Sequence, residues 1–564
     1  MLIDGQKLID QQLTITAKQT VSFDGGTSTV LTPVHYLPQP DGGGRTVSLD
    51  GDWRVAKWPF GGPEADLAGQ TTDDASWPTV PQPGKVFSLD PTRSIDNVPN
   101  WNRVGLDHID ADDGAMLRRA IEIPAAWCGK RVILRFDAIY PAACIYLNGE
   151  LLGEHLSGLT PVEYEITERV TPGAPALVAV RLLRKHKFVK MDMVRHSAEF
   201  AGLAQSACIF AVEPCLIRDC FMPAGLNDDF TTGRVAGTVS LANTGNAAAS
   251  GTLAAVLRDA DGLEVTRTET PVSLAAGAEE ALPLELLTEN PALWNDEFPN
   301  LYTVALDLQI NGQEPQQFSW RCGFRSFDLD NERPTLNGSF VKFRGVNHLT
   351  YHPEGGMHTP RAWLRQNLEL MKKANVNTIR THFLGPRYLA ELCDELGLYL
   401  LQELPIDWGT NYIHDPEWVG PAMMRIAGGV LRDRHRASVV VWSVGNENMP
   451  ESLEVSEDGY NHLRTYDRFT KTLDPTRPTM FPPPGPANKV RGIFEVRVGD
   501  IGDTHYSFNL AKDFLATREM INPKAWTGEM ERHTWEEARA LGWSGVWFSS
   551  EYGIMNMMPD LLHA

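Results

Sequence analysis

Short runs in which apolar and polar residues alternate dominate the chain between residues 46 and 322. Alternation with a period of two is the pattern of a β-strand that is buried on one face. The Asn148-Gly149 pair lies between two such runs and predicts a type I′ hairpin, because both turn positions need a positive φ. The pattern predicts two β-sandwiches, one over 46–222 and a second, of immunoglobulin size, over 223–328.

The period of the apolar residues changes after residue 330. Residues 363–371 have apolar positions at helical spacing, and a short apolar run over 376–379 follows them. Runs of strand length then alternate with predicted helices. The predicted strands lie at 341–347, 376–381, 398–403, 438–443, 478–481, 501–506, 524–528 and 544–549. Eight strand-helix steps predict a closed (β/α)8 TIM barrel over 329–564, with an N-terminal extension over 1–45.

The length and the charge of the chain narrow the classes of function. A chain of 564 residues is too long for one hydrophobic core, which agrees with several domains. Asp and Glu number 72 against 51 Lys and Arg, and the net charge of −21 repels nucleic-acid phosphates and anionic membranes. We therefore expect neither a nucleic-acid partner nor a membrane partner, whereas a homo-oligomer is compatible with the sequence.

The cysteines and the first residues indicate a reducing compartment. The seven cysteines show neither CxxC spacing nor nearby paired histidines, so we expect no zinc site, no disulfide framework and no cofactor. The first residues carry a charge too early for a secretory signal. The longest apolar runs are of strand length and too short to cross a bilayer. These features predict a cytoplasmic protein, and a secreted or periplasmic one only if the chain is a piece of a longer protein.

The most informative segment is an apolar strand over 441–444 that ends in Gly445-Asn446-Glu447. In a barrel this places a carboxyl and an amide at the carboxyl end of a strand, where the active site lies. A glycosidase needs both groups: a carboxylic acid protonates the leaving oxygen, and an amide binds the 2-hydroxyl as the ring becomes oxocarbenium-like. An isolated glutamate would more simply be a solvated residue, but its position after a buried run and beside Asn446 favours catalysis by Glu447.

Residues 441–448 also resemble the acid/base motif of glycoside hydrolase family 2, which includes β-galactosidases, β-glucuronidases and β-mannosidases. Further segments resemble consecutive parts of this family. They lie at 48–53, 146–149 and 153–155 for its jelly-roll sugar-binding domain, at 291–294, 299–302 and 323–325 for its immunoglobulin-like domain, and at 336–338, 343–348, 379–382 and 392–398 for its TIM barrel. Their number and order argue against coincidence, and together they extend the resemblance over most of the chain.

The resemblance implies a retaining exo-β-glycosidase that removes terminal β-linked sugars by double displacement through a covalent glycosyl-enzyme intermediate. It implies that Glu447 is the general acid/base and that Asn446 holds the sugar 2-hydroxyl. Further sugar contacts are implied for Arg380 and His382 on the second strand and for His505 and Tyr506 on the sixth. Trp408, in the loop after the third strand, is a candidate platform for a sugar ring. Arg380 has a second interpretation, in which it only pairs with a carboxylate inside the barrel.

Two glutamates compete for the role of nucleophile. The Ser-Glu-Tyr-Gly around Glu551 looks more like the nucleophile motif of the family. Strand counting favours Glu529 instead, because 524–528 would be the seventh strand and 544–549 the eighth. If Glu551 were the nucleophile, one strand-helix unit would be surplus. We therefore expect Glu529 to be the nucleophile and keep Glu551 as its alternative.

The sugar is less well determined than the reaction. After His382 the sequence runs Phe-Leu-Gly-Pro over 383–386, which differs from the usual pattern of galactosidases and glucuronidases and from that of mannosidases. We expect activity like that of a β-galactosidase, with β-glucuronidase and β-mannosidase as alternatives. A non-catalytic carbohydrate-binding protein with the same architecture is the alternative from another class, because a fold alone does not establish a function.

Overall fold

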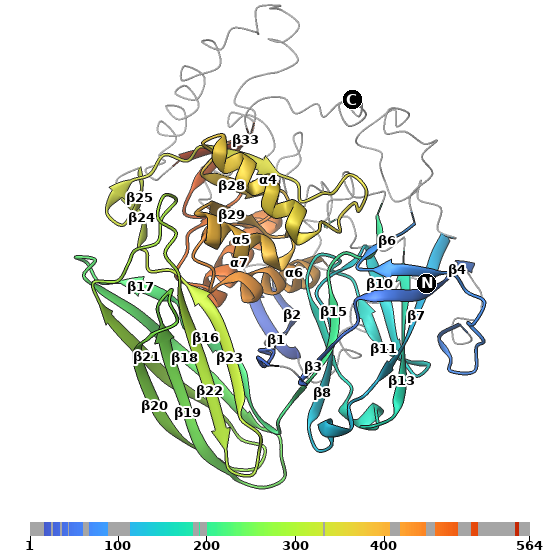
Figure 1. Ribbon diagram of the computed structural model, residues 1–564. Helices are drawn as coiled ribbons and strands as arrows, with labels where there is room; N and C mark the ends of the chain where they lie inside the picture. Colours follow the sequence, from blue (N-terminus) through green and yellow to red (C-terminus); the bar gives the residue numbers. More distant parts are fainter. Residues whose placement is uncertain are drawn as a thin grey trace, which may run out of the picture.

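The structure of the chain is a computed structural model. It describes residues 16–23, 26–33, 37–42, 44–59, 67–87, 113–183, 191, 200–330, 333–406, 418–446, 457–482, 498–505 and 547–551. Figure 1 shows a sandwich in blue and cyan, a second sandwich in green, and a domain whose helices are yellow and orange. The two sandwiches lie beside each other, and the helical domain lies above both in this view.

The first sandwich consists of antiparallel sheets with the orders β11-β10-β13-β7-β4-β5, β12-β8-β15-β3 and β6-β14-β9. Its strands are β3 (Thr46–Ser48), β4 (Gly51–Pro59), β5 (Thr79–Gln82), β6 (Gly84–Phe87), β7 (Asp113–Glu122), β8 (Arg131–Phe136), β9 (Ile139–Tyr140), β10 (Ala142–Leu147), β11 (Glu150–His155), β12 (Val162–Glu165), β13 (Pro175–Leu183), β14 (Ala201–Leu203) and β15 (Ala207–Val212). Trp53, Leu134 and Val180 are fully buried in its core. The predicted hairpin joins β10 to β11, and its Asn148 and Gly149 have φ angles of 53° and 89°.

The predicted N-terminal extension contains a two-stranded antiparallel hairpin. It consists of β1 (Thr16–Phe23) and β2 (Gly26–Pro33), which pair along their whole length. The second of these strands lies beside a helix of the barrel domain, α6 (Val419–Asp433). The extension is therefore not separate from the rest of the fold.

The second sandwich follows directly after the first. Its strands are β16 (Cys215–Phe221), β17 (Ala224–Leu226), β18 (Thr232–Asn243), β19 (Ala249–Arg258), β20 (Glu264–Leu274), β21 (Glu279–Glu289), β22 (Tyr302–Ile310) and β23 (Gln316–Cys322). One sheet joins β16, β18, β17 and β21, and the other has the order β20-β19-β22-β23. Because β16 pairs with β18, this sandwich begins at Cys215 and not at the predicted residue 223. Only Glu213 and Pro214 separate β15 from β16, which is a short linker between two domains.

Strands and helices alternate after a small antiparallel sheet of β24 (Phe327–Asp330), β25 (Arg333–Leu336) and β26 (Ser339–Phe340). The elements that follow are β27 (Gly345–His348), α4 (Arg361–Lys373), β28 (Thr378–Thr381), α5 (Arg387–Leu396), β29 (Tyr399–Glu403), α6, β30 (Val439–Ser443), α7 (Glu457–Leu473), β31 (Thr479–Met480), β32 (Gly502–His505) and β33 (Trp547–Glu551). Parallel pairing joins β27-β28-β29-β30-β31 in chain order, and a parallel bridge between Met480 and Ile501 continues this order to β32. Strands in chain order with helices between them confirm the predicted TIM barrel.

The last described strand differs from the predicted strand order. β33 overlaps the strand that was expected to be the eighth, but it pairs in parallel with β32, directly and without a strand between them. It therefore takes the seventh position, and the register places Glu551 opposite His505. The strand expected over 524–528 lies outside the described residues. The predicted eighth position of the run over 544–549 is therefore corrected to the seventh.

An arginine at the end of the second sandwich forms hydrogen bonds with the backbone at the beginning of β30. Arg325 donates hydrogen bonds to the carbonyls of Ala437 and Val439, at 2.5 and 2.6 Å, and Arg477 donates a further one to Val439 at 2.7 Å. Burial lowers the pKa of Arg325 to about 9, so it remains a cation at neutral pH. On the same strand, the Ser438 nitrogen donates to Asp394 Oδ1 at 2.7 Å. The amino end of β30 is thus fixed by buried polar groups from three other elements.

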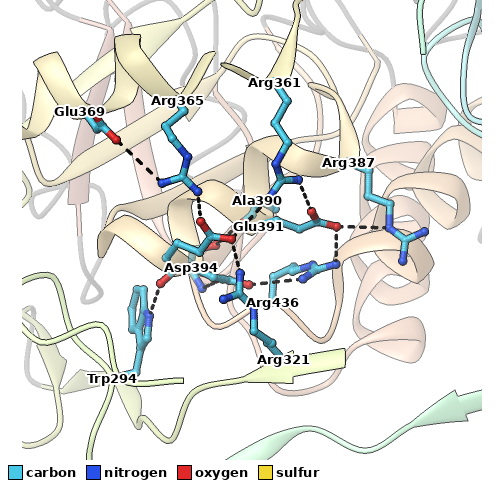
Figure 2. Close-up of polar contacts among 12 residues, drawn as sticks. Trp294, Arg321, Arg361, Arg365, Glu369, Arg387, Ala390, Glu391, Asp394 and Arg436 are labelled. Carbon is cyan, nitrogen blue, oxygen red and sulfur yellow. Dashed lines mark hydrogen bonds and ion pairs between the residues drawn. The ribbon is translucent and has the colours of Figure 1, made fainter. Parts of the chain in front are cut away.

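Figure 2 shows the ion pairs around the same end of the barrel. Arg321 of the second sandwich and Arg365 of α4 both bind the carboxylate of Glu395 in α5. The Trp294 indole donates to the carbonyl of Asp394 at 2.9 Å. These contacts join the second sandwich to α4 and α5. Within the residues that the structure describes, no helix is long and apolar enough to span a membrane.

Candidate active site

Four strands of the barrel bring polar side chains together at their carboxyl ends. Arg380 on β28 donates to Asn347 Oδ1 of β27 at 3.2 Å and to Asn446 Oδ1, just after β30, at 2.8 Å. The same guanidinium forms an ion pair with the carboxylate of Glu403, the last residue of β29. His382 lies next to this pair. We call these five residues the strand-end cluster.

Glu403 is the acidic residue of the cluster. Its side chain is 1% exposed and that of Arg380 is 2% exposed, so their ion pair is fully buried. Ser443 Oγ donates to Glu403 Oε2 at 3.4 Å, and the other carboxylate oxygen, Oε1, lies 3.8 Å from His382 Nδ1. Buried charges are stable only when they are paired and hydrogen-bonded, which explains why the two residues occur together.

Asn446 owes its position to the turn at the end of β30. Gly445 has a φ of 95°, a conformation that residues with a side chain rarely adopt, and it turns the chain sharply after the strand. The Val444 nitrogen donates to the carbonyl of Met480 at 2.8 Å, and the Asn446 nitrogen donates to the carbonyl of Ile406 at 2.9 Å. The backbone on both sides of the turn is therefore fixed by neighbouring strands and loops.

The orientation of the Asn446 amide follows from its neighbours. A guanidinium has only donors, so the atom that faces Arg380 must be the amide oxygen. The amide nitrogen then lies 3.4 Å from His382 Nε2. The amide nitrogen can donate to Nε2 in the tautomer that carries the ring proton on Nδ1, the nitrogen that faces Glu403.

The first sandwich supports the loop that follows His382. Phe383 and Leu384 are buried in one apolar cluster with Tyr140 and Phe200 of that sandwich. On the other side of the loop, Arg432 of α6 donates to the carbonyl of Gly385 at 2.8 Å. The position of His382 therefore depends on two domains.

The structure brings three of the predicted site residues together, namely Asn446, Arg380 and His382. Arg380 pairs with a buried carboxylate, that of Glu403, and its contact with a sugar stays a prediction. The backbones of His505 and Glu551 lie at opposite positions of β32 and β33, and their side chains are outside what the structure describes. The remaining predicted residues, Glu447, Trp408, Tyr506 and Glu529, lie outside the described residues.

Glu403 and Asn347 were not among the predicted site residues. The sequence does carry a signal for Glu403, because a charged residue ends the otherwise apolar run over 398–401. A charge at the end of a predicted barrel strand points to the catalytic face, and the buried arginine on the preceding strand is a suitable partner. Among the described residues, no group of three or more His, Cys, Asp and Glu is placed to hold a metal ion.

Two family models match the chain. Residues 215–325 match the model for glycosyl hydrolases family 2, and residues 327–499 match the model for the TIM barrel domain of the same family. Together the two matches cover about half of the chain. They coincide with the second sandwich and with the larger part of the described barrel.

The chain is also similar to named proteins. It is 28% identical to a β-galactosidase of Vibrio cholerae over 461 residues, which are 78% of this chain and 43% of that protein. It is 30% identical to β-galactosidase 2 of Enterobacter cloacae over 359 residues, 61% of this chain and 33% of that protein. The chain thus spans less than half the length of these curated relatives.

Solved structures resemble the fold. The crystal structure of a Bacteroides uniformis β-glucuronidase matches with a TM-score of 0.70 and 21% identity, over 85% of this chain and 58% of that one. A glycosyl hydrolase family 2 member from Bacteroides cellulosilyticus matches with a TM-score of 0.68 and 23% identity, over 84% of this chain and 62% of that one. Both matches confirm the arrangement of two sandwiches and a barrel.

Proposed function

The chain belongs to glycoside hydrolase family 2, and from this premise we propose that it is a retaining exo-β-glycosidase that removes terminal β-linked sugars. The observation that carries the proposal is the strand-end cluster. It holds the amide of Asn446 beside a buried ion pair at the carboxyl ends of the barrel strands, which is where TIM-barrel enzymes have their active sites. The residue next in the chain is Glu447.

In this proposal Glu447 is the general acid and base. It protonates the glycosidic oxygen in the first step and removes a proton from water in the second. The amide of Asn446 binds the 2-hydroxyl of the same sugar, an interaction that strengthens as positive charge develops on the ring. The two residues are adjacent in the sequence, and Asn446 directly follows the turn that ends β30.

We propose Glu551 as the nucleophile, in place of the Glu529 that strand counting favoured. The direct pairing of β33 with β32 supports this choice, because it makes Glu551 the residue that ends the seventh strand. A retaining enzyme needs its second carboxylate about 5–5.5 Å from the acid, across the mouth of the barrel. Glu447 follows the fourth strand, so the end of the seventh strand is three strands away from it around the barrel, whereas the end of the eighth is four strands away, on the opposite side, and is the farther of the two.

β-Galactosides are the first substrates to test, since the proteins that match in sequence are named β-galactosidases. β-Glucuronides come second because the enzymes that match in structure include β-glucuronidases. A panel of 4-nitrophenyl β-galactoside, β-glucuronide and β-mannoside distinguishes these sugars. Binding of a sugar without turnover of any of the three would indicate a carbohydrate-binding protein and contradict the proposed reaction.

The nucleophile is identified by trapping it. A slow 2-fluoro sugar of the preferred configuration should leave its glycosyl group esterified to Glu551, detected by peptide mapping. Glu551→Gln should lower turnover by about 10⁴-fold or more, as expected when one member of a catalytic unit is lost. The matched variant Glu529→Gln should remain close to the wild-type rate. A label on Glu529 would restore the original strand count.

A further inference from the structure

We propose that Glu403 is a positioning residue that fixes the direction of the Asn446 amide, so that the amide nitrogen serves the 2-hydroxyl of the sugar. This inference rests on the proposed function, because it concerns how the same site binds the 2-hydroxyl of its substrate. Glu403 acts through Arg380 on one side of the amide and through His382 on the other.

The first contact runs through Arg380. The Glu403 carboxylate forms a buried ion pair with this guanidinium, which lies beside the Asn446 oxygen, at 2.8 Å. Arginine offers donors alone, so the amide oxygen is held on the Arg380 side. If the amide were turned by 180°, its nitrogen would face the guanidinium, donor against donor, in a buried place.

The second contact runs through His382. Glu403 Oε1 lies 3.8 Å from His382 Nδ1, and the negative charge favours the tautomer that carries its proton on Nδ1. His382 Nε2 is then an acceptor, and it lies 3.4 Å from the Asn446 nitrogen. The same carboxylate therefore determines which group faces each end of the amide.

The orientation of the amide determines the direction of its hydrogen bond to the substrate. An amide whose oxygen is held by Arg380 meets a sugar as a hydrogen-bond donor, so the oxygen at position 2 must accept the bond. A neutral residue in place of Glu403 would remove the buried ion pair that holds the Arg380 guanidinium beside the amide oxygen and would remove the preference for one His382 tautomer. The amide would then lose its fixed direction, although every residue that touches the sugar would still be present.

The test compares the preferred 4-nitrophenyl β-glycoside with its 2-deoxy analogue. The measured quantity is the ratio of their kcat/KM values, which reports what the enzyme gains from the 2-hydroxyl. We expect this ratio to fall about tenfold in Glu403→Gln, equivalent to about 1.4 kcal/mol, and to fall at least as far in Asn446→Ala. Arg380→Lys, which keeps the charge but not the fork of donors, should also lower it.

Asp394→Asn is the matched control. Asp394 is also a buried carboxylate beside an arginine, since Arg436 lies 3.6 Å from it, and it also contacts the segment that forms β30. It does so at Ser438, at the opposite end of the strand from Asn446. This variant should lose stability but keep the ratio of the wild type.

The outcomes separate the two proposals. An equal loss on both substrates in Glu403→Gln, with the ratio unchanged, would mean that Glu403 only stabilises the barrel. A lower ratio in Asp394→Asn would mean that any loosening of the strand has the same effect, and would also overturn the inference. If the wild-type chain turns over no glycoside, the proposed function fails and the inference fails with it.

Discussion

At the scale of single residues, the site depends on a buried ion pair that need not touch the sugar. Arg380 contacts side chains from three neighbouring strand ends, and Glu403 forms an ion pair with it. Such a pair is a weak source of stability, because desolvation of both charges offsets their attraction. Its value lies in the geometry that it imposes on the guanidinium and on the side chains around it.

The role of Glu447 can be tested by substitution. Glu447→Gln removes the proton donor but keeps the size of the side chain. We expect the hydrolysis of alkyl β-glycosides to fall by about 10²–10⁴-fold, the usual contribution of general acid catalysis. The first step on 4-nitrophenyl or dinitrophenyl glycosides should change little, because these leaving groups need no proton. Pre-steady-state release of nitrophenol measures that step, and an equal loss on both kinds of substrate would contradict the assignment.

Residues at strand ends were the part of the site that could be predicted. Asn446, Arg380 and His382 each follow or end an apolar run, and the rule that barrel strands present their carboxyl ends to the site brought them together. Glu403 obeys the same rule, but its importance lies in its partners. A sequence shows that a residue carries a charge, whereas the two contacts that give this charge a role depend on distances across strands.

At the scale of elements, the beginning of β30 depends on an arginine from another domain. Arg325→Met would leave the carbonyl of Ala437 without this donor in a buried place, whereas the carbonyl of Val439 would keep its hydrogen bond from Arg477. We expect a loss of about 1–3 kcal/mol in the free energy of unfolding, the cost of one unsatisfied buried group. Urea denaturation followed by tryptophan fluorescence measures the change.

Arg321→Met provides the comparison from the same sandwich. The Arg321 side chain is 42% exposed and pairs with Glu395 near the surface. An exposed ion pair contributes about 1 kcal/mol or less, so the midpoint of denaturation should hardly move. Equal losses in the two variants would show that the hydrogen bonds from Arg325 contribute no more to stability than an exposed ion pair.

The order of the strands was predictable only in part. The buried runs that became β28, β29 and β30 are separated by clear helices, and each pairs with the next in the chain. Between β32 and β33 the sequence offers an additional segment of strand length at 524–528, and periodicity over five residues cannot distinguish a strand from part of a helix. Hydrogen-bond pairing, which a sequence does not display, placed β33 beside β32.

At the scale of the whole molecule, the second sandwich and the barrel share a partly buried histidine. The nitrogen of Met222 donates to His435 Nε2 at 3.2 Å, and the His435 ring lies 5.0 Å from that of Trp320. Desolvation and, second, the charge of Arg434 together lower the pKa of His435 from 6.5 to about 3. The junction of the two domains is therefore built around an imidazole that stays neutral in the folded protein.

This neutral imidazole predicts acid sensitivity. The unfolded chain binds a proton at His435 below about pH 6.5, whereas the folded chain does so only near pH 3. The contribution of His435 to the free energy of unfolding is therefore fully present above pH 6.5 and declines as the pH falls between these values. His435→Gln should be less stable at pH 7.5 but lose less stability between pH 7 and pH 4. Urea denaturation at four pH values measures both. An unchanged slope would show that His435 does not contribute to the acid sensitivity.

The parallel order of the barrel strands has a consequence for synthesis. From β27 to β31 each strand pairs with the strand that precedes it in the chain. A ribosome adds about 5–20 residues per second, so each strand emerges when its neighbour is already outside the exit tunnel. Arg325 also emerges before the two carbonyls that it binds. The sheet can therefore grow by one strand at a time beside a sandwich that has already been synthesised. Each new strand pairs with the strand that was synthesised just before it.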